Sequence, residues 1–372
     1  MSKDKKLKVV IAMSGGVDSS VSAALLKQAG FDVVGIMMKF WKDGSDGKNR
    51  CCSVESENLA RLVAEQIGIP FYVVNVEKEF KKKVVDYFLK EYKSGRTPNP
   101  CVVCNKEIKF GFLIQKSLTL GADFVATGHY ATTSFTDKLF LWGEPLYGAP
   151  STRKSSSVHF VKLLKSNDKN KDQSYFLWQL NQKQLGRVLF PVGGYTKPEV
   201  RKLAKKFNLP TAETPESQEV CFIQNQTNDF LRKYLKTKPG KIIDVSGKIV
   251  GEHQGLWFYT IGQRKGLEIN QGPWFVIEKD FKKNILVISK NKKDLLKKEL
   301  IAENVNWILP VKLPINAEVK IRYKSKLAKA KISADEKNRV KIIFQKPQQA
   351  VTPGQSAVFY RDSQLLGGGV IK

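Results

Sequence analysis

The sequence predicts a multidomain protein: an α/β domain with a parallel sheet, then a small, mainly-β central domain, then a C-terminal β-barrel. The chain has 372 residues, which is more than one typical domain. In its first part, apolar strand-like runs alternate with helical spacing, as in a parallel sheet covered on both faces. From Asn228 onwards, short segments alternate apolar and polar residues between glycine turns, which is typical of antiparallel strands. We therefore expect domains at 1–222, 223–290 and 291–372.

The first element is an apolar, β-branched run that ends at Ala12 and predicts a buried parallel strand. It leads into the loop Ser-Gly-Gly-Val-Asp-Ser-Ser at 14–20 and a helix at 21–28. Glycines let the backbone approach an oxyanion, and N–H groups at a helix start point at it, so this unit predicts an anion site. The loop lacks the lysine of the commoner phosphate loop, but it has hydroxyl donors and Asp18, a candidate metal ligand. Two glycines alone would also be compatible with an ordinary strand–helix turn that binds no anion, which is the alternative.

Strands and helices continue to alternate up to residue 130. Because ligands bind beyond the carboxyl ends of parallel strands, we expect Met38, Gly128 and His129 to lie near the 14–20 loop. For His129, a satisfied structural histidine is the alternative. The expected strands are 31–38, 71–76 and 124–130, and the expected helices are 55–67, 79–92 and 114–120.

Five cysteines in a chain of this length do not indicate a disulfide framework. Cys101 and Cys104 form a Cys-x-x-Cys pair in the segment 95–106, where two prolines predict a stiff, irregular loop. Such a pair is redox-active, binds zinc or provides a thiolate of low pKa, and two inert buried cysteines are the remaining alternative. Cys51 and Cys52 are the other candidate sulfur ligands for zinc.

The formal net charge of +28 favours a polyanion such as nucleic acid as the partner. The excess is densest towards the C-terminus, since residues from Leu231 onwards include 29 lysines and arginines against 12 acidic residues. A proteome rich in lysine, or a solvated face, is the alternative explanation. No apolar stretch is long enough to cross a bilayer and no signal-peptide region precedes the first strand, so we expect a cytoplasmic protein.

In the middle of the chain we expect an exposed, irregular insertion at 132–170 and a capped helix that starts at Thr196 and Pro198. The segment 210–218 predicts an extended, polar stretch that leaves Cys221 accessible to another protein, although a small buried hydrophobe is the alternative. Downstream we expect a helix at 229–235 and strands at 241–245, 248–252, 256–260, 285–289, 318–324, 328–333, 339–344 and 356–361.

Further motifs follow the 14–20 loop over nearly the whole chain. They are Gly-Arg-Thr-Pro-Asn-Pro-x-x-x-Cys-Asn at 95–105, Gly-His-Tyr-Ala at 128–131, Lys-Asp-Gln-Ser-Tyr-Phe-Leu at 171–177, Glu-Ser-Gln-Glu-Val-Cys-Phe-Ile at 216–223 and Tyr-Thr-Ile-Gly-Gln-Arg-Lys-Gly-Leu at 259–267. The 14–20 loop resembles the pyrophosphatase loop of N-type ATP pyrophosphatases, and all of these motifs, in this order, resemble those of tRNA-specific 2-thiouridylases.

The resemblance implies ATP-dependent 2-thiolation of the wobble uridine of tRNAs for Lys, Glu and Gln. ATP, accompanied by Mg²⁺, adenylates the uridine oxygen and releases pyrophosphate. A persulfide on Cys221 then delivers sulfur, and Cys104 acts as nucleophile or resolving thiol, in one route by forming a Cys104–Cys221 disulfide. The implied partners are tRNA and a sulfur donor, either a cysteine desulfurase or a sulfur-relay protein. We expect a monomer with no membrane partner and no metal beyond the Mg²⁺ bound with ATP.

The family's functional residues map onto matching positions of this chain. One departure is Cys101, which stands where the family commonly has an aspartate that is a candidate general acid or base. A thiol moves protons in that role only if its pKa is lowered, so the role of Cys101 is left open. The implied ATP-binding residues are Ala12, Met13, Ser14, Gly15, Gly16, Val17, Asp18, Ser19, Met38 and Gly128. The implied contacts with tRNA and the target base are Asn99, Pro100, Cys101, His129, Lys171, Asp172, Gln173, Arg322, Tyr323 and Gln355.

Three other classes of protein are alternatives. An iron–sulfur-dependent tRNA thiolase would use Cys101, Cys104 and Cys221 to hold three irons of a four-iron cluster. A ligase or amidotransferase with the same nucleotide loop would need no cysteines. A non-catalytic RNA-binding protein would explain the charge and the barrel, but not the intact loop.

Overall fold

The structure is a computed structural model whose residues fall into two compact units, each described here by itself. Unit 1 comprises Met1–Val84, Cys101–Gln224 and Ser363–Leu366, and unit 2 comprises Val85–Pro100, Asn225–Asp362 and Gly367–Lys372. The residues that the structure describes are 6–43, 53–135, 160–215, 220–223, 226–270, 272–336 and 338–372.

Unit 1 is built on a parallel sheet that, over the described residues, has five strands in the order β3-β2-β1-β4-β7. The central strand β1 is the apolar run next to the 14–20 loop, and its Val9, Val10 and Ile11 are fully buried. Strands of a sheet that is covered on both faces need continuous apolar residues rather than alternating apolar and polar residues. The strands are β1 (Lys8–Ala12), β2 (Asp32–Lys39), β3 (Phe71–Asn75), β4 (Phe124–Ala126) and β7 (Val188–Leu189).

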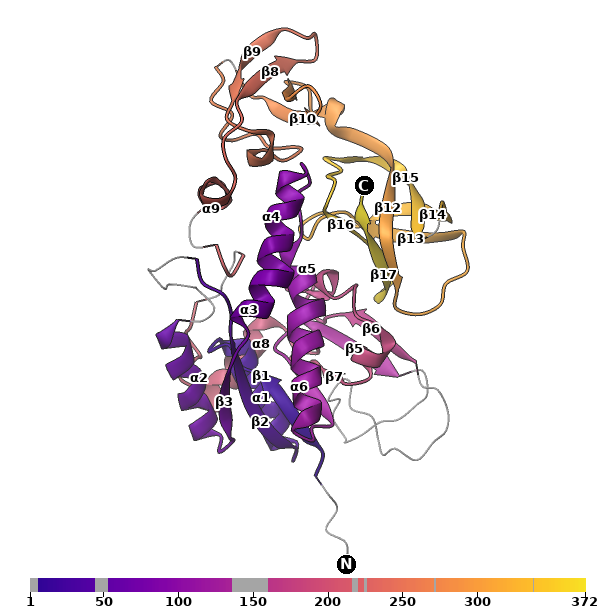
Figure 1. Cartoon of the computed structure of the whole chain (residues 1–372). Helices are drawn as coiled ribbons and strands as arrows, with labels where there is room; N and C mark the ends of the chain where they lie inside the picture. Colours follow the sequence, from indigo (N-terminus) through magenta and orange to yellow (C-terminus); the bar gives the residue numbers. More distant parts are fainter. Residues whose placement is uncertain are drawn as a thin grey trace, which may run out of the picture. The chain divides into compact units, whose positions relative to one another are not determined.

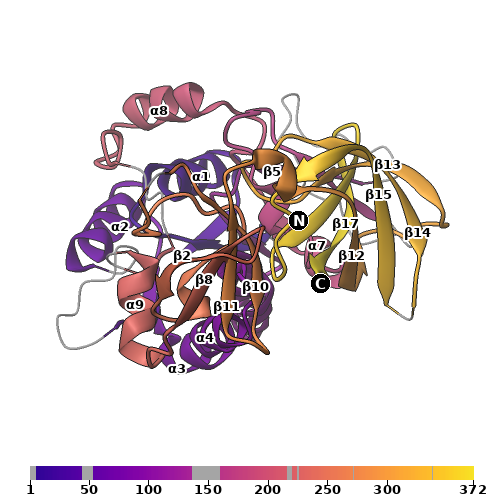
Figure 2. The ribbon, with the colours of Figure 1, turned by 90° about the horizontal axis from the view of Figure 1, so that it is seen from above.

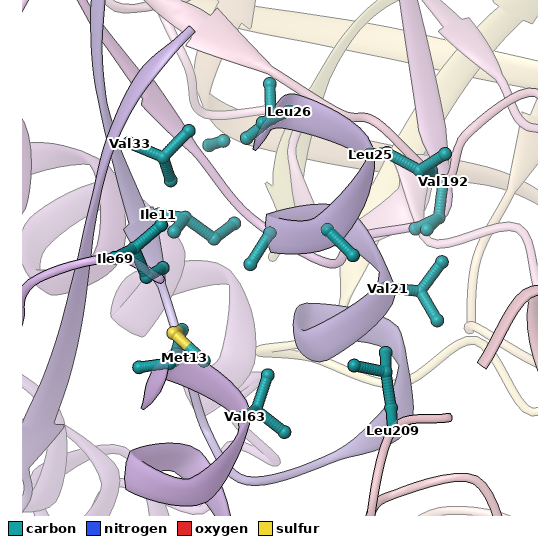
Figure 3. Close-up of a cluster of buried hydrophobic side chains, with 14 of the residues drawn as sticks. Ile11, Met13, Val21, Leu25, Leu26, Val33, Val63, Ile69, Val192 and Leu209 are labelled. Atoms are coloured by element: carbon teal, nitrogen blue, oxygen red, sulfur yellow. The ribbon is translucent and has the colours of Figure 1, made fainter. Parts of the chain in front are cut away.

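Helices pack along this sheet (Figure 1). Helix α1 contacts β1 and β2, α2 contacts β2, α6 contacts β4, and α8 packs on α1. Figure 3 shows the resulting core, in which Ile11 and Val33 of the sheet lie on one side of α1, whereas its Val21 and Leu25 point to the other side, towards Val192. The helices are α1 (Val17–Gln28), α2 (Val54–Gln66), α3 (Glu77–Phe80), α5 (Pro100–Cys104), α6 (Leu113–Thr119), α7 (Gln182–Leu185) and α8 (Lys197–Lys206), with a 3-10 turn η3 (Ser174–Phe176).

Unit 1 also contains an antiparallel pair, β5 (Ala131–Phe135) and β6 (Val161–Lys165). Gln364 and Leu365 extend it by pairing with β6. The expectation of an irregular insertion at 132–170 is therefore wrong over 132–135 and 161–165, which pair as strands, whereas 166–170 are irregular as expected. Residues 136–159 lie outside the described residues.

Unit 2 contains a four-stranded sheet, in the order β10-β11-β8-β9 among described residues. Strands β11 and β8 pair in parallel, and the other two pairs are antiparallel. The helix expected at 229–235 is confirmed as α9 (Thr227–Tyr234). The strand expected at 256–260 is wrong: a 3-10 turn η4 (Leu256–Phe258) forms there, after Gly255 with φ 152°. The strands are β8 (Gly240–Asp244), β9 (Ile249–His253), β10 (Phe275–Asp280) and β11 (Ile285–Ser289), and a 3-10 turn η5 (Lys292–Leu295) follows.

The C-terminal part of unit 2 is a closed barrel, whose strands are coloured orange to yellow in Figure 2. The strands follow the order β12-β15-β14-β13-β16-β17, and antiparallel pairing of β12 with β17 closes the ring, which removes exposed strand edges. Its strands, as far as the described residues show, are β12 (Leu296–Trp307), β13 (Ile315–Lys320), β14 (Ala328–Ala334), β15 (Arg339–Gln349), β16 (Ser356–Arg361) and β17 (Gln364–Ile371).

The segment Val85–Pro100 belongs to unit 2 although it lies early in the chain. It carries α4 (Asp86–Lys93), whose Phe88 packs against Phe230 of α9 with ring centroids 6.0 Å apart. The helix expected at 79–92 is therefore interrupted, by the π-helical turn η1 (Lys81–Val85). Among the described residues, no helix is long and apolar enough to cross a membrane.

The core of unit 1 provides a stability test. Ile11→Ala should lower the free energy of unfolding by about 2–5 kcal/mol, because Ile11 is 0% exposed and its removal leaves a cavity between the sheet and α1. Leu118→Ala on α6 is the matched control, since Leu118 is 43% exposed, and it should cost less than about 1 kcal/mol. Urea unfolding followed by circular dichroism measures both, and equal losses would contradict the assignment of this core.

Candidate functional site

The 14–20 loop lies at the point where the strand order of the sheet reverses. From β1 the chain continues into β2 and β3 on one side, whereas β4 and β7 lie on the other side. Since β1 and β4 are parallel neighbours, their carboxyl ends are adjacent. Open α/β sheets bind ligands at this place. The expected nucleotide loop thus lies at the edge of the sheet where folds of this class bind ligands.

Close backbone contact explains the glycine after β4. A Cβ atom on Gly128 would lie 2.7 Å from the backbone N of Ser19 and 2.8 Å from the carbonyl carbon of Asp18, so a side chain here would displace the start of α1. Met38, near the carboxyl end of β2, is 6% exposed. The structure therefore brings Gly128 to the loop, as expected.

The loop leaves N–H groups at the start of α1 without a side-chain cap. Gly16 is the N-cap residue and provides no side-chain hydrogen bond. The hydroxyls of Ser19 and Ser20 both donate to the Gly16 carbonyl oxygen at 3.0 Å, and the Ser14 N–H donates to the Ser19 hydroxyl at 3.2 Å. Such an uncapped helix start, with hydroxyls beside it, is suited to bind a phosphate.

Asp18 is the charged residue of the loop, and its carboxylate has two partners. Lys197 Nζ donates to Oδ1 at 2.7 Å and to Oδ2 at 2.9 Å, and the Tyr130 hydroxyl donates to Oδ1 at 2.7 Å. Lys197 starts α8, where the expected cap is confirmed by the capping box of Thr196 and Glu199. The candidate metal ligand is therefore already engaged by an ammonium and a phenol.

The 171–173 segment supports this arrangement through Tyr130. Gln173 Oε1 accepts from the Tyr130 N–H at 2.9 Å, and the Gln173 N–H donates to the Tyr130 carbonyl oxygen at 2.8 Å. Asp172 is buried, and its Oδ1 accepts from the N–H groups of Ser166 and Ser174. Lys171 is half-buried. The side chains of Asp172 and Gln173, both expected RNA contacts, therefore make hydrogen bonds inside unit 1.

Cys101 and Cys104 lie in a helix, so the expectation of an irregular loop at 95–106 is wrong over its second half. Pro100 is the first residue of α5, where a fixed φ and a missing N–H are compatible with a helix start. The chain continues into the π-helix η2 (Asn105–Phe112) and then α6. One turn apart on α5, Cys101 is exposed and Cys104 is 6% exposed.

The π-helix after Cys104 has a geometric requirement at Gly111. A Cβ atom there would lie 2.7 Å from the carbonyl oxygen of Lys106, five residues earlier, so the wide turn leaves no room for a side chain. Asn105 is 2% exposed, and its amide donates to the Phe176 carbonyl oxygen at 3.1 Å. This bond ties the cysteine helix to the 171–177 motif. Single π-turns are frequent at functional sites.

His129 is buried and uncharged at neutral pH. Burial, reinforced by the charge of Lys109, holds the pKa of the imidazole well below its usual range. Its Nδ1 lies 2.9 Å from the hydroxyl of Thr127, and the ring packs against Phe110 and Phe190. These contacts are those of a structural histidine, the alternative that the sequence left open.

Cys221 is half-buried. The next residue, Phe222, is 2% exposed and packs edge-on against Phe80 of α3, with ring centroids 5.7 Å apart, which anchors the segment. The neighbouring residues 216–219 and the candidate zinc ligands Cys51 and Cys52 lie outside the described residues. Within the part of the chain that is described, no three His, Cys, Asp or Glu side chains gather as a metal-binding group.

In unit 2, the turn at 353–355 holds the segment that precedes the cysteine helix. Gln355 Nε2 donates to the carbonyl oxygens of Thr97 and Pro98 at 2.9 and 3.3 Å, and the Thr97 N–H donates to the Pro353 carbonyl oxygen at 2.8 Å. Asn99 is half-buried. The amide expected to reach a base or sugar therefore binds the protein backbone.

Arg322, the expected phosphate fork, also makes internal bonds. Its guanidinium donates to the Ile261 carbonyl oxygen at 2.8 Å and to the Thr352 hydroxyl. The adjacent Tyr323 is half-buried, and Lys320 Nζ lies 5.4 Å from its ring centroid. Arg322 thus joins the 259–267 motif to the turn that holds Thr97.

Three family models match the chain. They are described as tRNA methyl transferase HUP domain, tRNA methyl transferase PRC-barrel domain and Aminomethyltransferase beta-barrel domain, over residues 7–225, 228–290 and 297–371. Curated relatives named tRNA-specific 2-thiouridylase MnmA match nearly the full length. That of Carboxydothermus hydrogenoformans is 44% identical over 98% of this chain and 97% of its own. The relative from Alkaliphilus oremlandii is 46% identical over 99% of this chain and 97% of its own length.

The chain belongs to the tRNA-specific 2-thiouridylase family. This membership and the structure confirm the expected fold class: a parallel-sheet α/β domain, a central domain and a C-terminal barrel.

Sequence reasoning missed Lys197 and Tyr130 as neighbours of the nucleotide loop in this thiouridylase-family chain. A signal was present for Lys197: a lysine in the first turn of a helix opposes the helix dipole, so it indicates a nearby counter-charge. The contacts of Gln355 and Arg322 had no such signal, because their partners are backbone carbonyls far away in sequence.

Gln355 can be tested as a support of the Thr97–Pro98 segment. Gln355→Leu removes two hydrogen bonds to that backbone and should speed hydrogen–deuterium exchange of a peptide spanning 94–99. Gln345→Leu, at an exposed position of β15, is the control and should leave the exchange unchanged. Weaker tRNA binding of Gln355→Leu with unchanged exchange would show instead that the side chain acts on RNA alone.

Proposed function

We propose that the chain is a tRNA-uridine 2-sulfurtransferase that converts ATP to AMP and pyrophosphate. It replaces the 2-oxygen of the wobble uridine with sulfur in tRNAs for Lys, Glu and Gln. The observation that carries the proposal is an uncapped glycine loop at the switch point of the same unit that contains Cys101, Cys104 and Cys221. Exchange of oxygen for sulfur needs both an activating nucleotide and a sulfur-bearing thiol. The names of the relatives agree on tRNA as the substrate.

The first step activates the uridine. A carbonyl oxygen is a poor leaving group, so the 2-oxygen attacks the α-phosphate of ATP and pyrophosphate departs. The α1 N–H groups and the hydroxyls of Ser14 and Ser19 hold the phosphates. Mg²⁺, which binds proteins through one or two carboxylates plus substrate phosphates, fits a loop with the single carboxylate Asp18 and would neutralise phosphate charge there.

The second step transfers sulfur. A donor, either a cysteine desulfurase or a sulfur-relay protein, loads Cys221, a half-buried residue, as a persulfide. The outer sulfur attacks the activated carbon and AMP leaves with the former uridine oxygen. Cys104 attacks the inner sulfur, which breaks the sulfur–sulfur bond and leaves a Cys104–Cys221 disulfide. A thiol reductant returns both cysteines to thiols. In the other route Cys104 attacks first and frees hydrosulfide.

Unit 2 supplies much of the proposed tRNA-binding surface. Residues from Leu231 onwards carry 29 basic against 12 acidic residues, and phosphate contacts dominate the affinity of proteins for nucleic acids. Asn99, Pro100, Lys171 and Tyr323 remain proposed contacts of tRNA and the target base. We propose domains at 1–222, 223–290 and 291–372, and a monomer that works in the cytoplasm.

Asp18→Ala tests the nucleotide step. It should abolish tRNA-dependent pyrophosphate release while leaving tRNA affinity within about twofold, because Asp18 acts on the metal and phosphates rather than on RNA. Asp32→Ala, at a carboxylate 49% exposed at the start of β2, is the control and should keep full release. A large loss of tRNA binding in a filter assay would contradict the role of Asp18.

The cysteines test the sulfur step. Cys221→Ser should still release pyrophosphate but form no thiouridine, since a hydroxyl cannot carry the second sulfur. Cys104→Ser should accept sulfur on Cys221 without transferring it, and Cys101→Ser should keep part of the activity. Peptide mass spectrometry after loading by a cysteine desulfurase, and nucleoside mass spectrometry of tRNA, measure these outcomes.

Two results would overturn this assignment. Added sulfur on Cys104 instead of Cys221 would reverse their roles. Loss of an iron–sulfur chromophore together with activity in all three cysteine variants would favour the cluster-dependent thiolase.

A further inference from the structure

A buried lysine touches the nucleotide loop from another element. Lys197 comes from the start of α8, its side chain is 9% exposed, and Nζ lies within 2.9 Å of both carboxylate oxygens of Asp18. Its backbone is fixed as well, because the Lys197 N–H donates to Asp168 Oδ2 at 2.9 Å. The ammonium is therefore held at a defined place beside the start of α1.

Stability does not explain this ammonium. A lysine at the start of a helix opposes the helix dipole. A buried ion pair is on average no more stabilising than apolar residues of the same volume, since desolvation offsets the attraction. The position of this ammonium, held by Asp18 at the nucleotide loop, therefore points to a role in ligand binding.

The loop itself has the wrong charge for its proposed ligand. Between Ala12 and Ser19, Asp18 is the charged residue, and it is negative, whereas a triphosphate carries several negative charges. Commoner phosphate loops contain a lysine that reaches the phosphates, and this loop has none. The positive charge must come from another segment, and Lys197 is an ammonium already in contact with the loop.

We propose that Lys197 is the phosphate-binding lysine of this site and that Asp18 holds it until the nucleotide arrives. This inference rests on the proposed use of ATP. When ATP enters, the ammonium moves from the carboxylate to the phosphates, and Asp18 becomes available to the accompanying Mg²⁺. Tyr130, whose backbone is fixed by Gln173, keeps its hydroxyl on Asp18 Oδ1 and so retains the carboxylate in place during the exchange.

The exchange has a consequence for metal binding. Without nucleotide, a divalent cation must displace the Lys197 ammonium from Asp18, so Mg²⁺ alone binds weakly. With nucleotide, the same ammonium is needed by the phosphates and no longer competes. Nucleotide and metal therefore bind together.

Calorimetric titration of the full chain with ATP and Mg²⁺ tests whether Lys197 binds the phosphates. Lys197→Met should weaken ATP binding about tenfold or more, as expected for loss of a charge-assisted hydrogen bond, while adenosine, which has no phosphate, binds as to the wild type. Lys202→Met, at an exposed position of the same helix, is the matched control and should change neither affinity. Lys197→Arg keeps the charge and should recover part of the ATP affinity.

Titration with ATP in EDTA tests whether Asp18 holds the Lys197 ammonium until the nucleotide arrives. Asp18→Asn should bind metal-free ATP more tightly than the wild type, because the carboxylate no longer repels phosphate or retains the ammonium. If Lys197 serves only to neutralise Asp18, the double variant Asp18→Asn/Lys197→Met should bind ATP as well as Asp18→Asn does. The proposal requires that the double variant stay about tenfold weaker than Asp18→Asn.

The outcomes separate this inference from the proposed function. Wild type that binds no ATP would overturn both. Wild type that binds ATP, with Lys197→Met equal to it, would overturn the role of Lys197 alone. Equal losses of ATP and adenosine affinity in Lys197→Met would show a purely structural role and would also overturn it.

Discussion

The close approach of two backbones, where β4 ends and α1 begins, is the constraint on which the site depends. Gly128 lies against Asp18 and Ser19 so tightly that no Cβ atom fits between them. This contact exists because β1 and β4 are neighbours in the sheet although they are far apart in sequence. It fixes the start of α1, whose N–H groups have no side-chain cap, at the point where the strand order reverses.

A chain of hydrogen bonds extends from this contact through unit 1. Gln173 fixes the backbone of Tyr130, Tyr130 holds Asp18, and Asp18 holds Lys197. Asp168, in turn, accepts from the first N–H of α8; although burial opposes its ionisation, such backbone donors keep its pKa below the usual value. Residues that belong to separate sequence motifs thus form one hydrogen-bond network. A substitution of Gln173 would therefore alter the position of Asp18 in the loop through Tyr130.

Much of the fold around the loop was predictable from the sequence, because these elements depend on local sequence patterns. The apolar β-branched run before Ser14, the glycines after it and the capping box at Thr196 each specify their own conformation. The helix at Pro100 was not predictable in the same way. A proline is compatible with either a loop or the first turn of a helix, and the tertiary contact of Asn105 with Phe176 is among those that favour the helix. The partners of Lys197, Arg322 and Gln355 are set by the fold, so they follow from no local rule.

Besides requiring glycine at position 111, the π-helix η2 makes chain length a sensitive property of the cysteine helix. Each residue of an α-helix turns the chain by roughly 100°. Deleting one residue between Asn105 and Phe112 would let the wide turn close to an α-helix with the flanking helices still in phase, whereas a further deletion or an insertion would rotate Cys104 by about that angle relative to α6. Substitutions on the exposed side of this segment leave the rotation unchanged. Insertions and deletions here should therefore be far rarer among functional variants than substitutions, in contrast to ordinary surface loops.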